Sequence, residues 1–197
     1  MRHFLLIFII ISSFLTGCGT SRKTTDARSH ATRTTAEADD SVEHSSVAPS
    51  PVNYHDQTTW LLGYYDPALL RREPHAAWFL EGLDEYMPNT DALNSLIDIQ
   101  KDNITIKIVM GTWCPDSRRE VPRFMKIMEL WQFPADKITF IGVDDAKQSP
   151  VGDFASLNIS RVPTFIFYKN NSEAGRIIEV PKTSLEQDIV NILSGNE

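Results

Sequence analysis

The segment from Ile104 to Trp131 limits the possible fold most strongly, because it joins a strand pattern directly to a helix pattern. Ile104–Met110 is apolar and rich in β-branched residues, which predicts a buried strand. Gly111-Thr112 interrupts that pattern, and Pro115 is tolerated in the first turn of the helix that follows. The predicted apolar face of this helix carries Val121, Phe124, Met125, Met128 and Trp131. A strand, a tight turn and a helix therefore follow one another, with Cys114 at the turn.

The residues after this helix continue the alternation of strands and helices. Pro134 ends the helix, and a short helix is predicted over Val151–Leu157. Further strands are predicted over Ile138–Val143, Thr164–Tyr168 and Arg176–Val180, the last two separated by a turn at Asn170-Asn171-Ser172. Thr183 and Glu186 match a capping box at the start of a last helix, whose apolar side carries Leu185, Ile189, Ile192 and Leu193. This order predicts an α/β fold with a mixed sheet.

The region before this alternation is predicted to be ordered from about Thr58. We predict a strand over Thr59–Tyr64, a helical turn over Pro67–Arg72 and a helix with Pro74 as its first residue. Apolar residues at helical spacing are Ala76, Phe79, Leu80, Leu83 and Met87, and then Leu93, Leu96 and Ile97 in a second helix over Asp91–Gln100. The region is aromatic, with Trp60, Tyr64, Tyr65, Trp78 and Tyr86. These rings either line a groove for a partner or belong to an amphipathic core, and core packing is the default interpretation.

The first 18 residues have the pattern of an export signal. Arg2 and His3 precede an apolar run over Phe4–Ile11 that Phe14 and Leu15 extend. The run is short for a membrane span, which needs about 20 apolar residues. Leu15-Thr16-Gly17-Cys18 resembles the lipobox of bacterial lipoproteins, which implies cleavage before Cys18 and lipid on its sulfur. The alternative is an ordinary signal peptide or membrane anchor with an incidental cysteine.

The predicted location follows from this resemblance. Gly19, rather than Asp, comes after the lipidated cysteine, which in enteric lipoproteins favours the outer membrane. We therefore expect a lipid-anchored protein of the bacterial cell envelope, on the periplasmic side of the outer membrane.

A polar tract separates the lipidation site from the folded part. Residues Gly19–Asn53 are rich in Ser, Thr, Ala and charged side chains, so they bury too little apolar surface to offset the entropy of ordering. We predict a signal peptide over 1–17, the lipidated Cys18 and a disordered tether over 18–57, and a folded domain over 58–197. Irregularly spaced histidines at 30, 44 and 55 are interpreted as solvated, and no metal site is expected. A net charge of −7 without a basic patch argues against binding nucleic acid.

Only one free thiol is expected in the exported protein. The sequence has two cysteines, Cys18 and Cys114, and a lipidated Cys18 has no thiol. No internal disulfide can then form in a compartment that permits disulfides. A lone cysteine there indicates intermolecular chemistry or a reactive free thiol.

The neighbours of Cys114 indicate a nucleophile. A cysteine ahead of a helix is favoured as a thiolate by the helix amides and dipole. Ser117 and Arg118 lie three and four residues on, where a hydroxyl and a positive charge could stabilise the thiolate, whereas Asp116 opposes them. Ser117 also stands where a second cysteine would complete a dithiol pair. We expect an exposed turn at Cys114; the alternative is a buried, inert cysteine.

The motifs around this cysteine resemble those of the thioredoxin fold. Trp113 directly precedes the cysteine, Pro122 stands in the following helix at the place of the family's kinking proline, and Val162-Pro163-Thr164 stands at its cis-proline loop. The order of elements over Gly142–Lys169 is also the family's. The resemblance covers about Asp91–Leu193 and implies a central mixed β-sheet flanked by helices. It leaves 58–90 as an atypical N-terminal helical extension of a thioredoxin-like domain with a single-cysteine, CxxS-type active site.

The same resemblance implies roles for individual residues. Pro163, with its neighbour Val162, implies a substrate-binding loop facing the active cysteine, and a cis X-Pro bond marks such a tight turn. An ordinary trans proline at a strand start is the alternative. The family's buried acid, proposed there to assist proton transfer, falls here on Ile108. Glu120 stays open as a substitute.

These residues predict thiol–disulfide exchange with one sulfur. Cys114 would attack a client disulfide and form a mixed disulfide, with Trp113, Ser117 and Arg118 completing the site. Because a serine hydroxyl cannot resolve that bond, release needs the client's own thiol, a small thiol such as glutathione, or a partner protein. This is isomerase-like or monothiol chemistry on disulfide- or thiol-containing exported proteins, without a bound cofactor. The alternatives are a non-catalytic module that binds client peptides or a partner protein, and a sensor that forms a sulfenic acid on Cys114.

Overall fold

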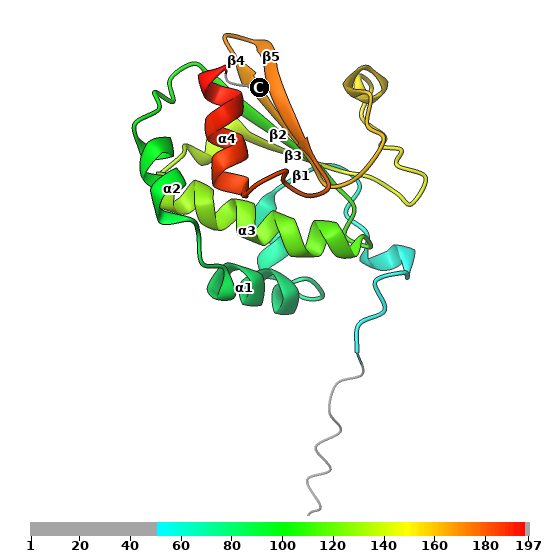
Figure 1. Cartoon of the computed structure of the whole chain (residues 1–197). Helices are drawn as coiled ribbons and strands as arrows, with labels where there is room; N and C mark the ends of the chain where they lie inside the picture. Colours follow the sequence, from blue (N-terminus) through cyan, green and yellow to red (C-terminus); the bar gives the residue numbers. More distant parts are fainter. Residues whose placement is uncertain (1–50, 196–197) are drawn as a thin grey trace, which may run out of the picture. The chain divides into compact units, whose positions relative to one another are not determined.

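A mixed five-stranded sheet forms the centre of the protein (Figure 1). The structure is a computed structural model and describes residues 51–195. The strand order is β1-β3-β2-β4-β5. The strands are β1 (Gly63–Tyr65), β2 (Ile104–Met110), β3 (Ile138–Gly142), β4 (Thr164–Lys169) and β5 (Ser172–Ile178). Strands β2 and β3 are parallel, whereas β1 pairs antiparallel with β3, and β4 pairs antiparallel with both β2 and β5. The predicted α/β fold with a mixed sheet is thereby confirmed.

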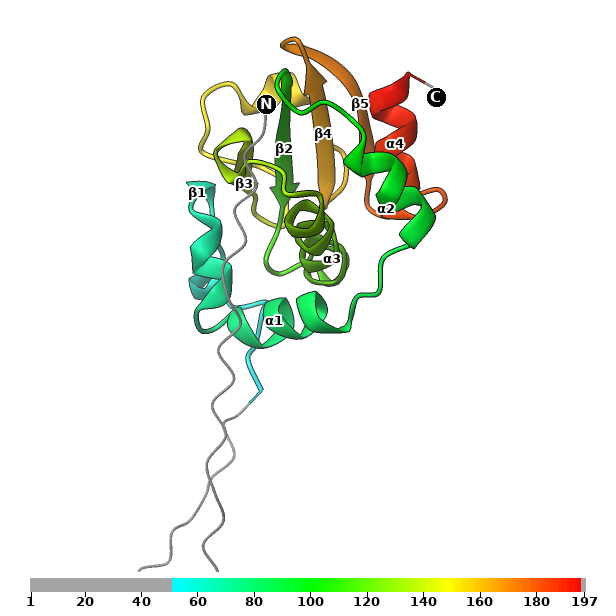
Figure 2. The same cartoon turned by 90° about the vertical axis from the view of Figure 1, so that its left-hand side faces the viewer.

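Four α-helices accompany the sheet in the described residues. They are α1 (Ala76–Glu85), α2 (Thr90–Ile97), α3 (Pro115–Trp131) and α4 (Leu185–Ser194). Helices α3 and α4 lie over one face of the sheet, α1 packs against α3, and α2 packs against α4 (Figures 1 and 2). Among residues 51–195 no helix has the length and apolarity needed to cross a membrane.

The alternation of side chains along the strands creates two apolar cores. Ile106 and Ile108 of β2 face the larger core together with Phe124 of α3, whereas Val109 faces the smaller core on the other side of the sheet. The smaller core contains Cys114 and is closed by the 3-10 turn η4 (Phe154–Leu157). The turn that carries Cys114 therefore lies where β2 ends and α3 begins.

The N-terminal elements differ in detail from the sequence-based expectation. The strand is shorter than predicted, because residues 57–59 form the 3-10 turn η1 and β1 begins only at Gly63. Pro74 lies in a turn after a cis peptide bond, and α1 starts at Ala76. The predicted turn at residue 67 is the 3-10 turn η2 (Pro67–Arg71). Leu80 is 41% exposed and Met87 lies beyond the helix, and of the α1 residues only Phe79 and Leu83 are buried.

The aromatic residues of this region mostly join the core. Tyr65, Trp78 and Tyr86 pack against the larger core, which agrees with the default interpretation. Tyr64 is instead 58% exposed, and the ring of Trp60 lies against that of Trp113.

The C-terminal hairpin is tighter than predicted. Asn170 and Asn171 both have positive φ and form a two-residue turn, so β5 already begins at Ser172 and ends at Ile178. Residues 151–153 are not helical, and only η4 forms in that region.

The predicted capping box of the last helix is wrong. Ser184 is the N-cap, and its hydroxyl accepts a hydrogen bond from the Gln187 amide. The Thr183 hydroxyl donates to Asp188, while Glu186 is fully buried and accepts from the Tyr86 hydroxyl at 2.9 Å. Glu186 is drawn inward by a tyrosine 100 residues away, which the local pattern could not show.

Candidate functional site

Cys114 is the N-cap residue of α3 and turns its sulfur inward. Its φ and ψ are −78° and 123°, and Pro115 follows at the first helical position. The Cys114 carbonyl accepts a hydrogen bond from the Arg118 amide at 3.1 Å. The Sγ donates to the Val162 carbonyl at 3.3 Å and packs in the smaller core. The residue is only 6% exposed, so the expectation of an exposed cysteine is wrong. The helix N-terminus nevertheless favours negative charge at this position.

The loop opposite the sulfur contains a cis proline. The Val162–Pro163 bond is cis, as the sequence analysis expected, and both residues are buried. The Pro163 carbonyl accepts the Glu179 amide at 2.7 Å, and the Thr164 hydroxyl donates to the Arg161 carbonyl at 2.7 Å. These bonds fix the loop from both sides, so the Val162 carbonyl stands directly at the sulfur.

Ser117 lies on the inner side of α3 and is fully buried. Its Oγ accepts a hydrogen bond from the Gly111 amide at 3.4 Å. The hydroxyl oxygen therefore contacts the loop before the cysteine, and among the described contacts the hydroxyl makes no hydrogen bond to the Cys114 sulfur.

Trp113 fastens the loop to the end of β3. Its indole Nε1 donates to the Val143 carbonyl at 3.0 Å. The ring lies so close over Gly111 that a Cβ there would come within 2.4 Å of Nε1. Gly111 is thus needed as glycine because the tryptophan ring occupies the place of a side chain.

Arg118 points to main-chain oxygens. Its Nη1 donates to the carbonyls of Thr112 and Trp113, at 3.0 and 2.8 Å, and its guanidinium lies 4.4 Å from the centre of the Tyr54 ring. The arginine therefore places a positive charge beside the loop. The direct contact with the cysteine that the helical spacing suggested is not among its hydrogen bonds.

The acidic residues near the site are paired with arginines. Ile108 is fully buried in the larger core, so no acid stands at that position. Glu120 is buried, and its Oε1 accepts from Arg119 at 2.7 Å and from Arg123 at 3.3 Å. The hydrogen bond with Glu120 raises the pKa of Arg119. Asp116 also pairs with Arg119, at 2.8 Å, so its charge is offset instead of opposing the thiolate. The carboxyl group of Glu120 is therefore paired with two arginines, and these contacts tie side chains of α3 together.

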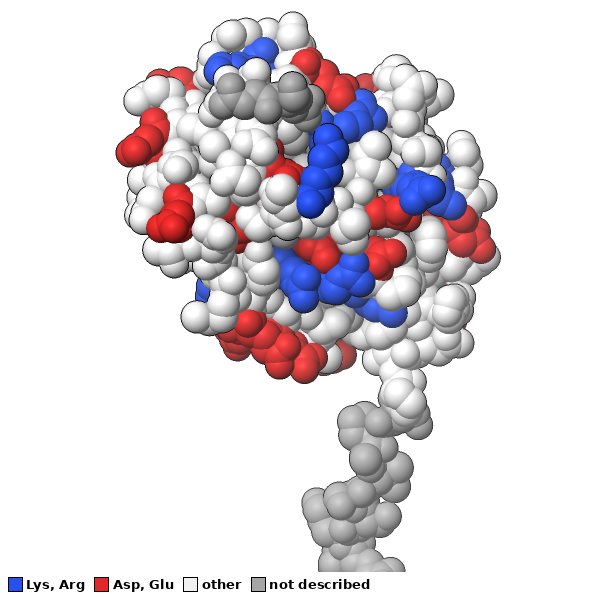
Figure 3. All heavy atoms as spheres, viewed as in Figure 1, with Lys and Arg blue, Asp and Glu red and all other residues white. Residues whose placement is uncertain are grey.

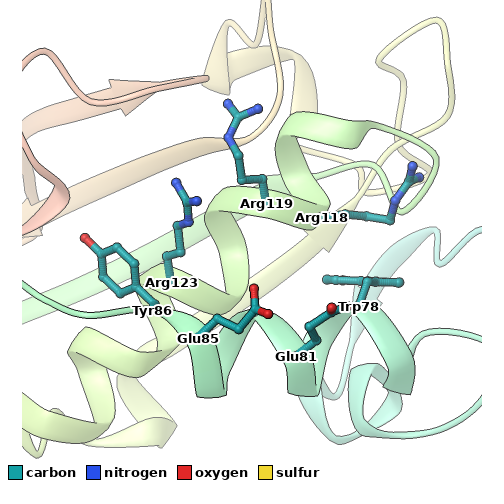
Figure 4. Close-up of a pocket in the computed structure, with 8 residues that line it drawn as sticks. Trp78, Glu81, Glu85, Tyr86, Arg118, Arg119 and Arg123 are labelled. Carbon is teal, nitrogen blue, oxygen red and sulfur yellow. The ribbon is translucent and has the colours of Figure 1, made fainter.

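A charged pocket of about 380 Å³ lies between α1 and α3, beside this loop. Arg118, Arg119 and Arg123 extend from α3, and Glu81 and Glu85 extend from α1 (Figure 4). Figure 3 shows a basic area over α3 with an acidic area next to it. Within residues 51–195, no group of three or more His, Cys, Asp or Glu side chains is arranged to hold a metal ion.

Sequence reasoning missed the part of the site supplied by residues 54–61. Tyr54 stacks on Arg118, and the hydroxyl of Thr112 donates to the carbonyl of Thr59. The high aromatic content of this region was the only signal, and it did not indicate contact with the cysteine loop. The predicted residues from Trp113 to Arg118 and the loop at Val162 do come together. The predicted lipidation site at Cys18 lies outside the described residues, as do the predicted signal peptide, almost all of the tether, and the histidines at 30 and 44.

Comparison with known proteins places this arrangement in a family. The sequence profile of the family described as Thioredoxin matches residues 88–191. A TPR repeat-containing thioredoxin of Arabidopsis thaliana is 35% identical over 79 residues, 40% of this chain but 19% of that protein. A putative thioredoxin of Dictyostelium discoideum is 30% identical over 98 residues, 49% of this chain and 88% of that protein.

Solved structures also match this chain. Oxidized thioredoxin O2 of Arabidopsis thaliana matches with a TM-score of 0.31 and 21% identity, covering 48% of this chain and 81% of that chain. A Pseudomonas aeruginosa protein of unknown function matches with a TM-score of 0.42 and 14% identity, covering 60% of this chain and 79% of that chain.

Proposed function

This chain belongs to the thioredoxin family, and from that membership we propose that it carries out thiol–disulfide exchange through one nucleophilic cysteine, Cys114. Its thioredoxin relatives support a thiol–disulfide oxidoreductase-like function in general. The observation that carries the proposal is the position of the sulfur, at the N-terminus of α3 and 3.3 Å from the Val162 carbonyl of the cis-proline loop. Ser117 supplies no second sulfur to this site.

The first step is attack by the Cys114 thiolate on one sulfur of a client disulfide. A bond forms between Cys114 Sγ and that sulfur, the client disulfide breaks, and the other client sulfur leaves as a thiolate that takes up a proton. Val162 and Pro163 hold the client segment beside the sulfur. Trp113 and Arg118 keep the loop before the cysteine in place.

The second step needs a thiol from outside the site. In the first route the released client thiolate attacks another disulfide of the client and frees a different client thiolate. That thiolate then attacks the client sulfur of the mixed disulfide, which returns Cys114 and leaves the client's disulfides rearranged without net oxidation or reduction. Alternatively a small thiol such as glutathione attacks Cys114 or the client sulfur, and a second small thiol completes a net reduction. No bound cofactor takes part in either route, and the small thiol is a co-substrate.

Turnover tests this proposal. Full-length protein in detergent, incubated with glutathione and a protein whose disulfides are scrambled, is expected to accelerate reshuffling. Cys114→Ser is expected to abolish the acceleration while leaving the fold intact, because oxygen cannot form the mixed disulfide. In cells, clients disulfide-linked to Cys114 should be isolated from the wild type and absent from Cys114→Ala. An inactive wild-type protein without trapped clients would refute the proposal.

A second candidate function is a non-catalytic module that binds client peptides or a partner protein at the cis-proline loop. The burial of Cys114, at 6% exposure, favours it, because a client disulfide cannot reach the sulfur in this conformation. Client binding that survives Cys114→Ala, together with an absence of turnover, would support this alternative.

We further propose that the protein is exported and lipid-anchored through Cys18, on the periplasmic side of the outer membrane. The apolar N-terminus and the lipobox-like residues 15–18 support this location. Its clients would then be exported proteins with thiols or disulfides, and nucleic acids would not be partners.

A further inference from the structure

The residues just before β1 contact the loop that carries the cysteine. We propose that Tyr54, Thr59, Thr112 and Arg118 form a clamp that positions this loop and limits the opening of the Cys114 thiol. The proposal rests on the exchange function of Cys114 and goes beyond it, because Tyr54 and Thr59 lie outside residues 88–191, which match the family.

One half of the clamp is the stack between Tyr54 and Arg118. The guanidinium donates charge-assisted hydrogen bonds to two consecutive loop carbonyls, those of Thr112 and Trp113. Its other side is covered by the Tyr54 ring at 4.4 Å, a distance suited to a cation–π contact. Arg118 can hold both carbonyls only while its plane is kept in this orientation.

Tyr54 is itself held in place from several directions. Its hydroxyl donates to the Pro74 carbonyl at 3.0 Å, and its own carbonyl accepts the Trp60 indole N–H at 2.9 Å. Its ring also stacks with His75, with centroids 6.4 Å apart. The tyrosine therefore connects the arginine to the turn before α1.

The other half of the clamp is Thr112. This residue is 1% exposed, and its Oγ donates to the Thr59 carbonyl at 3.2 Å and accepts the Leu61 amide at 3.4 Å. The rings of Trp60 and Trp113 lie next to this contact, with centroids 6.3 Å apart. The segment before β1 thus contacts the loop at each of the two residues before Cys114.

These contacts bear directly on access to the sulfur. The Cys114 sulfur is covered while it stays at the Val162 carbonyl, and a movement of the loop that frees it would shift the clamp contacts. Tyr54, Thr59, Thr112 and Arg118 are accordingly positioning residues, which act through the loop without touching a client.

Alkylation of Cys114 by iodoacetamide in the folded full-length protein measures this opening. Tyr54→Leu removes the stack while Arg118 and its charge remain, and Thr112→Val removes only the hydroxyl. Each is expected to raise the alkylation rate about three- to tenfold, as the loss of one such contact implies. Tyr54→Phe keeps the aromatic face and should stay within about twofold of the wild type.

Tyr86→Leu is the matched control. Tyr86 also donates a hydrogen bond through its hydroxyl and lies against an arginine of α3, with the Arg123 guanidinium 5.5 Å from the ring centre, but that arginine does not bond to the cysteine loop. In Tyr86→Leu, the alkylation rate of Cys114 should rise only by the amount that the measured loss in free energy of unfolding predicts.

The clamp is overturned if Cys114 is alkylated at the wild-type rate in Tyr54→Leu and Thr112→Val. It is also overturned if Tyr86→Leu, at the same free energy of unfolding as these variants, shows the same rise in alkylation rate. Alkylation needs no client and no turnover, so its outcome is separate from that of the exchange assay. Active exchange with unchanged alkylation would refute the clamp alone. Altered alkylation without exchange would refute the proposed function alone.

Discussion

Ser117 is the residue that limits what the site can do after the first attack. A buried hydroxyl that accepts from the Gly111 amide stabilises the turn but offers no thiolate. Its replacement by cysteine changes one atom at a position one helical turn from Cys114, where family members carry the resolving thiol.

We predict that Ser117→Cys shortens the life of mixed disulfides. A thiol at this position can attack the bond between Cys114 and a client, so the trapped fraction should fall at least about tenfold. The measurement is the yield of disulfide-linked complexes on a non-reducing gel after rapid alkylation. Ser95→Cys adds a thiol on the exposed face of α2 and should leave the yield unchanged. Equal trapping by Ser117→Cys and the wild type would contradict the prediction.

His75 should make the stability of the protein fall on acidification. Burial lowers the pKa of His75 below its ordinary value of 6.5, the Arg118 charge lowers it further, and Glu73 partly opposes them. The unfolded chain therefore binds a proton more readily than the folded one, so the free energy of unfolding declines as the pH falls below about 6.5.

Urea denaturation between about pH 7.5 and 5.5 measures this effect. His75→Phe, which keeps an aromatic ring beside Tyr54 and Trp78, is expected to lose less stability over this interval than the wild type. The same loss in both proteins would show that His75 does not carry the effect.

At the scale of elements, the crossing of α1 and α3 depends on a glycine. A Cβ at Gly82 would lie 2.6 Å from Cγ of Pro122, the proline inside α3. The proline ring is rigid and lies within a packed helix, so it cannot turn aside as a long side chain would. The two helices can approach this closely only because residue 82 has no side chain.

Gly82→Ala should therefore destabilise the protein by up to about 2 kcal/mol, because an overpacking strain of about 1–3 kcal/mol outweighs the gain in helix propensity of about 1 kcal/mol. Thermal and urea unfolding would measure the change. Gly152→Ala is the control, since nothing lies within 4 Å of a Cβ built there. A neutral or stabilising Gly82→Ala would mean that α1 shifts on α3 at little cost.

At the scale of the whole molecule, the proposed lipid anchor and the folded domain make separate contributions. We predict that Cys18→Ser moves the protein from the membrane fraction to the soluble fraction and abolishes incorporation of labelled palmitate, because thioether attachment requires the sulfur. Exchange activity of the purified protein should not change, since Cys114 and the Val162–Pro163 loop both belong to the folded domain. Retained palmitate in Cys18→Ser would contradict the anchor.

Local patterns predicted the elements well where one side of a segment faces a core. Ile104–Met110 is a strand over the predicted residues, because every second residue faces the larger core. The prediction failed at Pro74 and at the start of α4, where the ends of the helices are set by turns and by the burial of Glu186 against Tyr86. Such ends depend on partners distant in sequence.

The sequence by itself determined the chemistry available to this protein. It shows one cysteine ahead of a helix, a serine in place of the second thiol, an isoleucine in place of an acid, and a proline at the place of the family's cis-proline loop. The tertiary structure alone decided how those groups are used. It turned the thiol toward the Val162 carbonyl, directed Arg118 to the loop carbonyls, and brought Tyr54 against Arg118, 64 positions along the chain. These outcomes depend on contacts between distant segments, and helical spacing describes only neighbours within one element.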